Sequence, residues 1–267
     1  MIRQPDILNN YKELGHLIMR IHIFSLFREM FNSPFSFGLL KRAVSKRLLE
    51  INIHNIRDYS RDSHHTVDDY SYGGGSGMVL KPEPISEAVH EVLSEYSDGI
   101  RKGIPVLLLS PQGKLFTQEM AEQLAQKEVI ALICGRYGGV DERIGIGLAT
   151  EEISVGDYVL SGGELPAMIV VESVARLIPG VVGSEESVKS DSITSGLLQH
   201  PLYTRPFSYQ GLDVPSVLLS GDHKKVDQWR REQSLLRTLR RRPDLLQKAD
   251  LSNEDLDYLR SQGYDNG

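Results

Sequence analysis

Apolar and polar residues are ordered along residues 20–178 in a way that predicts strands interleaved with helices. Continuous apolar runs predict buried strands at residues 21–26, 105–109, 129–134 and 152–160. Helical spacing of apolar residues predicts helices at residues 84–96, 141–148 and 164–178. Thr117 is a predicted N-cap of one more helix, which carries Met120 and Leu124. This alternation predicts an α/β fold with a parallel sheet that is covered on both faces.

Three of the predicted strands end in glycine-containing turns. Parallel sheets bind their ligands beyond the carboxyl ends of the strands. We therefore expect residues 110–113, 135–139 and 161–163 to line one shared pocket.

The turn at Gly162 and Gly163 is the most informative of the three, because it joins an apolar run directly to a predicted helix. Adjacent glycines allow positive φ and a close approach of ligand to backbone, so the turn predicts a nucleotide-like site. The glycines lack the G-x-G-x-x-G spacing, and no Lys-Ser/Thr pair follows them. We expect a nucleotide-like ligand that is bound by a less common route.

Beyond residue 182 the composition changes. Residues 183–196 are almost wholly polar and predict a flexible linker. Residues 226–239 place Val226, Trp229, Leu236 and Leu239 near one helical face, so residues 196–267 are predicted to form a small helical domain. Residues 1–18 are predicted to be a disordered extension, and Met19 is an alternative start.

Composition limits the function classes. Cys134 is the single cysteine, so an intrachain disulfide cannot form, which fits a reducing, cytoplasmic protein. No apolar run reaches the roughly 18–20 residues of a membrane span, so no membrane association is predicted.

The net charge of −6 disfavours nucleic acid as a partner, yet residues 223–242 contain eight cations against two acids. These cations are Lys224, Lys225, Arg230, Arg231, Arg237, Arg240, Arg241 and Arg242. They fit a phosphate-backbone footprint as well as they fit a solvated helix face.

Simpler interpretations exist for most of the other candidates. Asp141 and Glu142 are expected to cap a helix, and Arg176 to be an exposed charge in a last helical turn. Asp191 lies in the polar linker, where a carboxylate is normally solvated and inert. The glycine-rich residues 72–77 are as consistent with a flexible loop as with a site. Cys134 is predicted to be a core thiol, and His64 and His65 lack partners at a metal-ligand spacing.

Taken in order, these segments resemble one family, the bacterial tRNA (guanine-N1)-methyltransferases of the TrmD type in the SPOUT class. The resemblance extends from Met19 to about Leu246. The matching motifs lie at residues 23–31, 65–69, 72–78, 109–113, 134–137, 140–143, 154–168, 176–181, 196–198, 203–206 and 215–223.

The resemblance implies a deep trefoil knot in the parallel-sheet domain, although general topology rules disfavour knots. It implies S-adenosylmethionine as the methyl donor, held in a bent shape by three loops. The residues that match these loops are Leu108, Leu109, Ser110, Pro111, Gly135, Tyr137, Val155, Gly156, Tyr158, Leu160, Gly162, Gly163 and Pro166. It also implies a homodimer with shared active sites, a donor-binding catalytic domain at residues 19–182, a linker at 183–195 and a tRNA-binding domain at 196–267.

The implied reaction is methyl transfer to N1 of guanosine 37 of tRNA, next to the anticodon. The resemblance places the general base on Asp191 and its partner on Arg176. Guanine N1 carries a proton that a carboxylate can accept, and a guanidinium can stabilise the charge that moves to O6. The family also implies a Mg²⁺ requirement, for which the sequence shows no ligand set.

Two positions depart from the family pattern. Gly138 stands where a glutamate is common, and Arg28 where a proline is common. The residues before Met19 have no counterpart. Two other hypotheses stay open, a non-catalytic RNA-binding protein of the same fold and a SPOUT methyltransferase that acts on another RNA site.

Overall fold

The computed structural model describes residues 18–74, 77–183 and 191–265. The chain divides into two compact units, Met1–Gly183 and Ser184–Gly267. The predicted extension at residues 1–18 therefore lies outside the described residues except for Ile18, as do residues 184–190 of the predicted linker.

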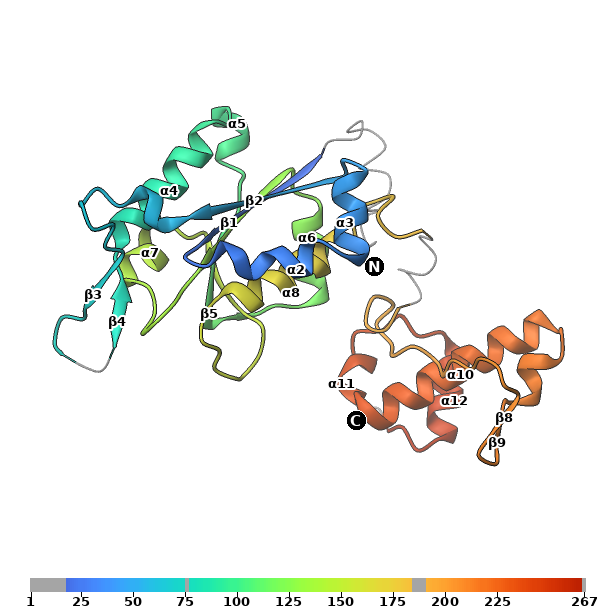
Figure 1. Ribbon diagram of the computed structural model, residues 1–267. Helices are drawn as coiled ribbons and strands as arrows, with labels where there is room; N and C mark the ends of the chain where they lie inside the picture. Colours follow the sequence, from blue (N-terminus) through green and yellow to red (C-terminus); the bar gives the residue numbers. More distant parts are fainter. Residues whose placement is uncertain (1–17, 75–76, 184–190, 266–267) are drawn as a thin grey trace. The chain divides into compact units, whose positions relative to one another are not determined.

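The first unit is built on a five-stranded sheet in the order β2-β1-β6-β5-β7, in which every neighbouring pair is parallel (Figure 1). The strands are β1 (Met19–Ser25), β2 (Leu49–Asn55), β5 (Val106–Leu115), β6 (Val129–Cys134) and β7 (Glu151–Ser154). Every residue of the central strand β6 is buried, as its continuous apolar run predicts. The predicted parallel sheet is confirmed.

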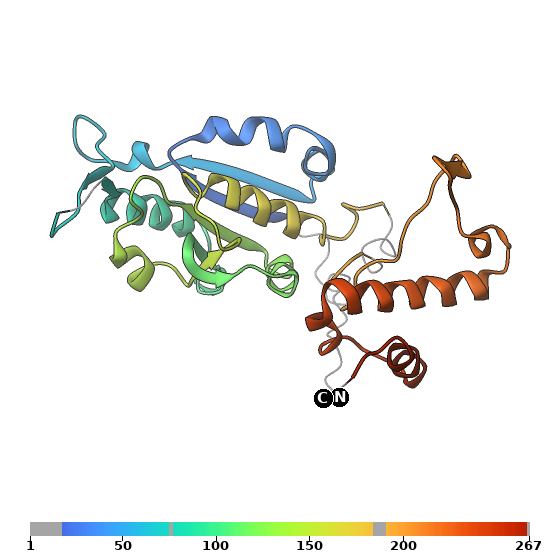
Figure 2. The same ribbon diagram turned by 90° about the horizontal axis from the view of Figure 1, so that it is seen from below.

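Helices cover both faces of this sheet (Figure 2). They and the remaining strands of the unit are η1 (Arg28–Phe31), α2 (Asn32–Phe35), α3 (Gly38–Ser45), η2 (Ile56–Tyr59), β3 (Asp68–Tyr70), β4 (Met78–Leu80), α4 (Pro82–Ser94), α5 (Asp98–Arg101), α6 (Gln118–Ala125), α7 (Glu142–Gly147) and α8 (Glu164–Ala175).

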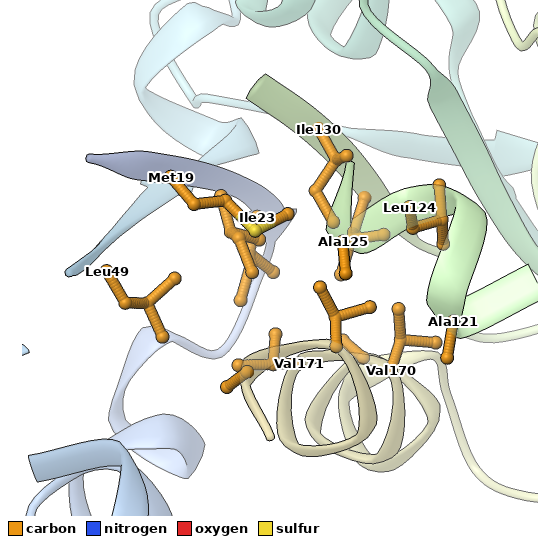
Figure 3. Close-up of a cluster of buried hydrophobic side chains, with 14 of the residues drawn as sticks. Met19, Ile23, Leu49, Ala121, Leu124, Ala125, Ile130, Val170 and Val171 are labelled. Carbon is orange, nitrogen blue, oxygen red and sulfur yellow. The ribbon is translucent and has the colours of Figure 1, made fainter. Parts of the chain in front are cut away.

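The two faces carry separate apolar cores. On one face, residues of α3, α6 and α8 pack against β1 and β6, and Val170 and Val171 of α8 belong to the same cluster as Ile130 of β6 (Figure 3). On the other face, α4 and α7 pack around Phe24 and Ile133. The two sides of β1 and β6 are thus buried in different cores, which is why β6 is apolar at every position.

Most predicted elements occur within a few residues of their predicted bounds. Thr117 is the N-cap of α6, and its hydroxyl accepts a hydrogen bond from the Met120 amide at 3.3 Å. The strand predicted over residues 152–160 is wrong in its second half, since β7 ends at Ser154. Gly156 turns the chain with a φ of 150°, and residues 157–160 are exposed.

Strand β2 was missed because it lies at the edge of the sheet. Its sequence alternates the apolar residues Leu49, Ile51 and Ile53 with polar ones, so it contains no continuous apolar run. The antiparallel pair β3–β4, which carries the glycine-rich segment, was not predicted either.

The second unit contains β8 (Ser208–Tyr209), β9 (Leu212–Asp213), η3 (Ser216–Leu219), α10 (His223–Arg241), α11 (Pro243–Leu246) and α12 (Asn253–Ser261). Its core includes Leu197, Leu235, Leu246 and Leu259. The helix predicted over residues 226–239 corresponds to α10, which Asp222 caps by accepting a hydrogen bond from the Lys225 amide. Across the described ranges of both units, no helix has the length and apolarity that a bilayer crossing requires.

Candidate functional site

The register of the sheet brings the carboxyl ends of three strands together. Leu109 of β5 pairs with Cys134 of β6 on one side and with Ile153 of β7 on the other. Gly135, Ser110 and Ser154 therefore follow one another across the sheet edge. Two of the three turns that the sequence predicted to share a pocket start from this edge.

The β5 turn is looped out of the sheet. Leu109 and Lys114 both pair with Ile153, so residues 110–113 protrude between two paired positions. A Cβ atom on Gly113 would lie 2.4 Å from the backbone carbon of Glu152, so the returning chain touches β7 directly. The predicted donor residues Ser110 and Pro111 lie in this loop, which is held at both ends.

The β6 turn is strained. Tyr137 has a φ of 59°, which a residue with a Cβ adopts at a cost of about 1–2 kcal/mol. The Gly138 amide donates to the Met78 carbonyl at 2.7 Å, and the Leu80 amide donates to the Gly139 carbonyl at 3.0 Å. Strain of this kind in a fixed loop is typical of functional sites.

The contact of residue 138 with the Met78 carbonyl explains why this position is a glycine. A Cβ atom at this position would lie 2.9 Å from the Met78 carbonyl oxygen, closer than side chains normally come. A glutamate, which the resemblance leads us to expect at this position, would require either the loop or β4 to shift.

The paired glycines at 162 and 163 act differently from the sequence-based expectation. Neither has a positive φ, and that of Gly163 is −81°. A Cβ on Gly163 would lie 2.7 Å from Cα of Cys134, and a Cβ on Gly162 would lie 2.4 Å from Nε of Arg136. The lack of side chains at Gly162 and Gly163 thus leaves room for neighbouring segments of the protein's own chain. The Gly163 amide donates to the Gly135 carbonyl at 2.9 Å, which joins the third turn to the second.

The segment between β7 and α8 is the most exposed of the predicted donor loops. The Tyr158 hydroxyl donates to the Val155 carbonyl at 3.1 Å, so its ring folds back over Gly156. Val159 is 89% exposed and Leu160 37% exposed, whereas Pro166 in the first turn of α8 is buried. The segment thus leaves apolar side chains on the surface beside the sheet edge.

A cavity of about 90 Å³ lies at this edge. Its lining includes Leu108, Leu109, Ser110, Pro111 and Gly135 among the predicted donor residues. The carboxylates of Asp141, Glu142 and Glu152 also lie on its wall. The predicted residues Tyr137, Val155, Gly156, Tyr158, Leu160, Gly162, Gly163 and Pro166 do not line it. The cavity is smaller than the roughly 300–1,000 Å³ of ligand pockets.

The predicted capping role of Asp141 is confirmed. It is the N-cap of α7, where its carboxylate accepts hydrogen bonds from the Arg143 amide at 3.0 Å and the Arg143 guanidinium at 2.8 Å. Hydrogen bonding to Arg143 lowers the pKa of the Asp141 carboxyl. In the described ranges, no three His, Cys, Asp or Glu side chains form a metal-binding group, so we assign no residue to Mg²⁺.

Cys134 is a core thiol, as predicted. It is fully buried within the apolar core under α8. Burial, and then the charge of Glu164, raises the pKa of this thiol well above its ordinary value. The thiol therefore stays protonated and is a poor nucleophile.

The two predicted catalytic residues belong to different units. Arg176 is the C-cap of α8 in the first unit and is exposed, as the simpler interpretation predicts. Asp191 is half-buried and opens a series of turns in the second unit, where the Ser192 hydroxyl accepts a hydrogen bond from the Gln199 amide.

Five of the eight cations in residues 223–242 are engaged in contacts within the second unit. Arg231 forms a two-point ion pair with Asp255, at 3.0 and 2.7 Å, and Asp255 in turn caps α12. Arg237 donates to the Gln199 carbonyl at 3.1 Å. Lys225, Arg230 and Arg242 pair with nearby aspartates. Within residues 191–265, no ion pair is formed by Lys224, Arg240 or Arg241.

Comparison of the sequence with known protein families matches this chain to one of them. The model of the family described as tRNA (Guanine-1)-methyltransferase TrmD matches residues 19–248. This chain belongs to the TrmD family. The matched range contains all three predicted donor loops, Arg176, Asp191 and α10.

Individual relatives agree with the family model. A protein named tRNA (guanine-N(1)-)-methyltransferase from Dehalococcoides mccartyi strain 195 is 54% identical over 237 residues, which is 89% of this chain and 94% of the relative. One from Pelotomaculum thermopropionicum is 54% identical over 242 residues, 91% of this chain and 95% of the relative. One from Staphylococcus carnosus is 52% identical over 237 residues, 89% and 94% of the two chains.

Sequence reasoning assigned no role to three residues that are linked by contacts beside these turns, namely Ser25, Arg136 and Glu164. Arg136 and Glu164 each follow a glycine at the end of an apolar run. Charges beside such buried turns are a signal for an internal ion pair, and these two residues form one.

Proposed function

We propose that this protein transfers a methyl group from S-adenosylmethionine to N1 of guanosine 37 in tRNA, next to the anticodon, and yields 1-methylguanosine. The observation that carries the proposal is the meeting of the glycine-containing turns after β5 and β6 and before α8 in a chain of the TrmD family. A tRNA substrate leads us to expect the reaction in the cytoplasm. We assign the donor and catalytic domain to residues 19–182, the linker to 183–195 and a helical tRNA-binding domain to 196–267.

The donor loops fit a small cationic ligand that carries a nucleoside. The turns offer backbone groups close to the cavity. Glu142 and Glu152 supply negative charge on its wall, where the Asp141 carboxylate is already paired with Arg143. When bound, S-adenosylmethionine supplies an electrophilic methyl group on a sulfonium. Because the cavity is only about 90 Å³, we expect the exposed residues 157–160 to move when the donor enters.

The proton on guanine N1 is the chemical obstacle. We propose that the Asp191 carboxylate accepts it and that the Arg176 guanidinium stabilises the negative charge which then develops at O6.

Substitution of Asp191 by Asn tests the base assignment. We expect the single-turnover methylation rate to fall about 10²–10⁴-fold, with donor affinity within about twofold of the unmutated value. Asp257→Asn, which removes an exposed carboxylate on α12, is the matched control and should keep the full rate. Near-normal turnover in Asp191→Asn contradicts the assignment.

We propose that tRNA phosphates contact cations at the two ends of α10, Lys224 at its start and Arg240 and Arg241 at its end. Tyr203, Phe207 and Tyr209 are exposed in the same unit and offer stacking surfaces. Replacing the three cations by Gln should weaken tRNA binding and reduce the salt slope by about one for each lost phosphate contact. Arg260→Gln on α12 is the control, and an unchanged slope in the triple variant would exclude this footprint.

We also propose a homodimer with shared active sites. Val159 and Leu160 of the donor loop and Leu165 and Ile169 of α8 expose apolar side chains along one segment. Such a patch suits a protein interface. Ile169→Glu should shift the sedimentation coefficient from dimer to monomer, whereas a monomeric unmutated protein would exclude this proposal.

A knotted backbone is part of the same proposal. After the edge strand β7 the chain returns past β5, pairs with the end of β6 through Gly162 and Arg136, and continues into α8. This return crossing is what a trefoil knot needs. An experimental structure whose backbone path contains no knot would exclude it.

Two measurements separate this function from its rivals. A non-catalytic RNA-binding protein gives no methyl incorporation into unmodified tRNA. A methyltransferase for another RNA site incorporates methyl groups, but mass spectrometry of the nucleosides finds them elsewhere than on N1 of guanosine 37.

A further inference from the structure

An ion pair is buried beneath the donor loops. The Glu164 side chain is 1% exposed and the Arg136 side chain 15% exposed, and Oε2 of Glu164 lies 2.9 Å from Nε of Arg136. The other carboxylate oxygen accepts a hydrogen bond from the Ser25 hydroxyl at 2.8 Å. Both oxygens of the buried carboxylate are therefore engaged.

These contacts join three segments that are distant in sequence. Ser25 ends β1, Arg136 follows β6, and Glu164 opens α8. Arg136 also donates to the Ser161 carbonyl at 3.2 Å, and its guanidinium carbon lies 4.5 Å from the centre of the Phe27 ring. One guanidinium thus spans the second and third donor turns.

An ordinary structural role does not account for this arrangement. Buried ion pairs are costly to desolvate, and apolar residues of similar size often stabilise a core as well or better. This pair also constrains its neighbour, because a Cβ on Gly162 would lie 2.4 Å from Nε of Arg136 and 2.6 Å from Oε2 of Glu164. The pair therefore sets the local backbone of the turn.

We infer that Ser25, Arg136 and Glu164 are positioning residues, which hold the turns at residues 135–137 and 161–163 at the spacing that the methyl donor requires. The inference rests on the proposed function. Arg136 directly precedes the strained Tyr137, so the ion pair fixes one end of that residue's backbone. Misplacement of binding groups by about 1 Å lowers catalytic efficiency up to about a hundredfold.

The test compares donor affinity with tRNA affinity in the full-length protein. Arg136→Lys keeps the charge but loses the planar fork, and Ser25→Ala removes a single hydroxyl. We expect the calorimetric Kd for S-adenosylmethionine to rise about tenfold or more in Arg136→Lys and severalfold in Ser25→Ala. The Kd for tRNA should stay within about twofold in both. Glu164→Gln is expected to have the largest effect, and the two milder variants keep the test valid if it does not fold.

Matched controls come from the second unit. Arg231→Lys changes the ion pair with Asp255, and Thr238→Ala removes a buried hydroxyl that bonds to Ser234 and Leu198. Both should lower the thermal midpoint while donor affinity stays unchanged.

Two outcomes overturn the positioning role. One is unchanged donor affinity in folded Arg136→Lys and Ser25→Ala. The other is a parallel loss of donor affinity, tRNA affinity and thermal midpoint, which indicates a structural pair only. Failure of the unmutated protein to bind the donor counts against the proposed function instead.

Discussion

Gly162 and Gly163 precede α8, and Gly73 and Gly74 lie between β3 and β4. A Cβ atom at either of the first two positions would collide with the protein's own chain, although neither has a positive φ. At the second two positions a Cβ would meet nothing within 4 Å, but φ is 84° and 80°. The first pair is required by close packing and the second by backbone conformation. A glycine-rich sequence does not distinguish the two reasons, whereas substitutions do.

The largest effect is expected for Gly163→Ala. The added methyl group would lie 2.7 Å from Cα of Cys134 and 3.1 Å from the Gly135 amide nitrogen, which are backbone atoms and cannot rotate away. We expect the free energy of unfolding to fall by about 1–3 kcal/mol. Urea denaturation measures it, and a loss below about 0.5 kcal/mol would show that α8 moves freely relative to β6.

Gly138 should respond less, because its close neighbour is the Met78 carbonyl of the short strand β4. We expect Gly138→Ala to lower the free energy of unfolding by about 1–2 kcal/mol and to weaken donor binding in calorimetry. Gly138→Glu should bind the donor no more tightly than Gly138→Ala does. Tighter donor binding by Gly138→Glu than by the unmutated protein would instead show that the loop accepts a glutamate, and that glycine at this position only removes a favourable contact with the donor.

Gly74 should show a conformational effect without a steric one. Gly74→Ala is expected to lower stability by about 1 kcal/mol, and Gly74→Asn by less, because asparagine tolerates positive φ. Native-state hydrogen exchange of the β3 and β4 amides reports this locally. Equal effects of the two substitutions would indicate a hidden contact at this turn.

Gly147 is expected to show the smallest effect and the opposite sign. It ends α7 with no atom within 4 Å of an added Cβ and without a positive φ. Gly147→Ala should therefore raise the free energy of unfolding by roughly 0.5 kcal/mol. A loss in urea denaturation would mean that open space around a glycine does not predict tolerance in this protein.

The same distinction explains what could be predicted from the sequence. Continuous apolar runs located β1, β5 and β6, because burial on both faces leaves a direct signal. Edge strand β2 gave an alternating pattern and was missed. The turn before α8 was located, but its explanation by positive φ was wrong, since a contact such as Gly163 with Cys134 joins residues that no local pattern connects. The partners of Arg136 and Arg231 depend on the fold in the same way.

The hydrogen bond between Ser25 and Glu164 joins residues that are 139 positions apart. At roughly 5–20 residues per second, β1 is synthesised about 7–28 s before the residue that completes its end of the site. During that interval the growing chain contains β1, but the Glu164 carboxylate that binds Ser25 has not yet been synthesised. The buried carboxylate beneath the proposed donor site is therefore added only after all five strands of the sheet have been synthesised.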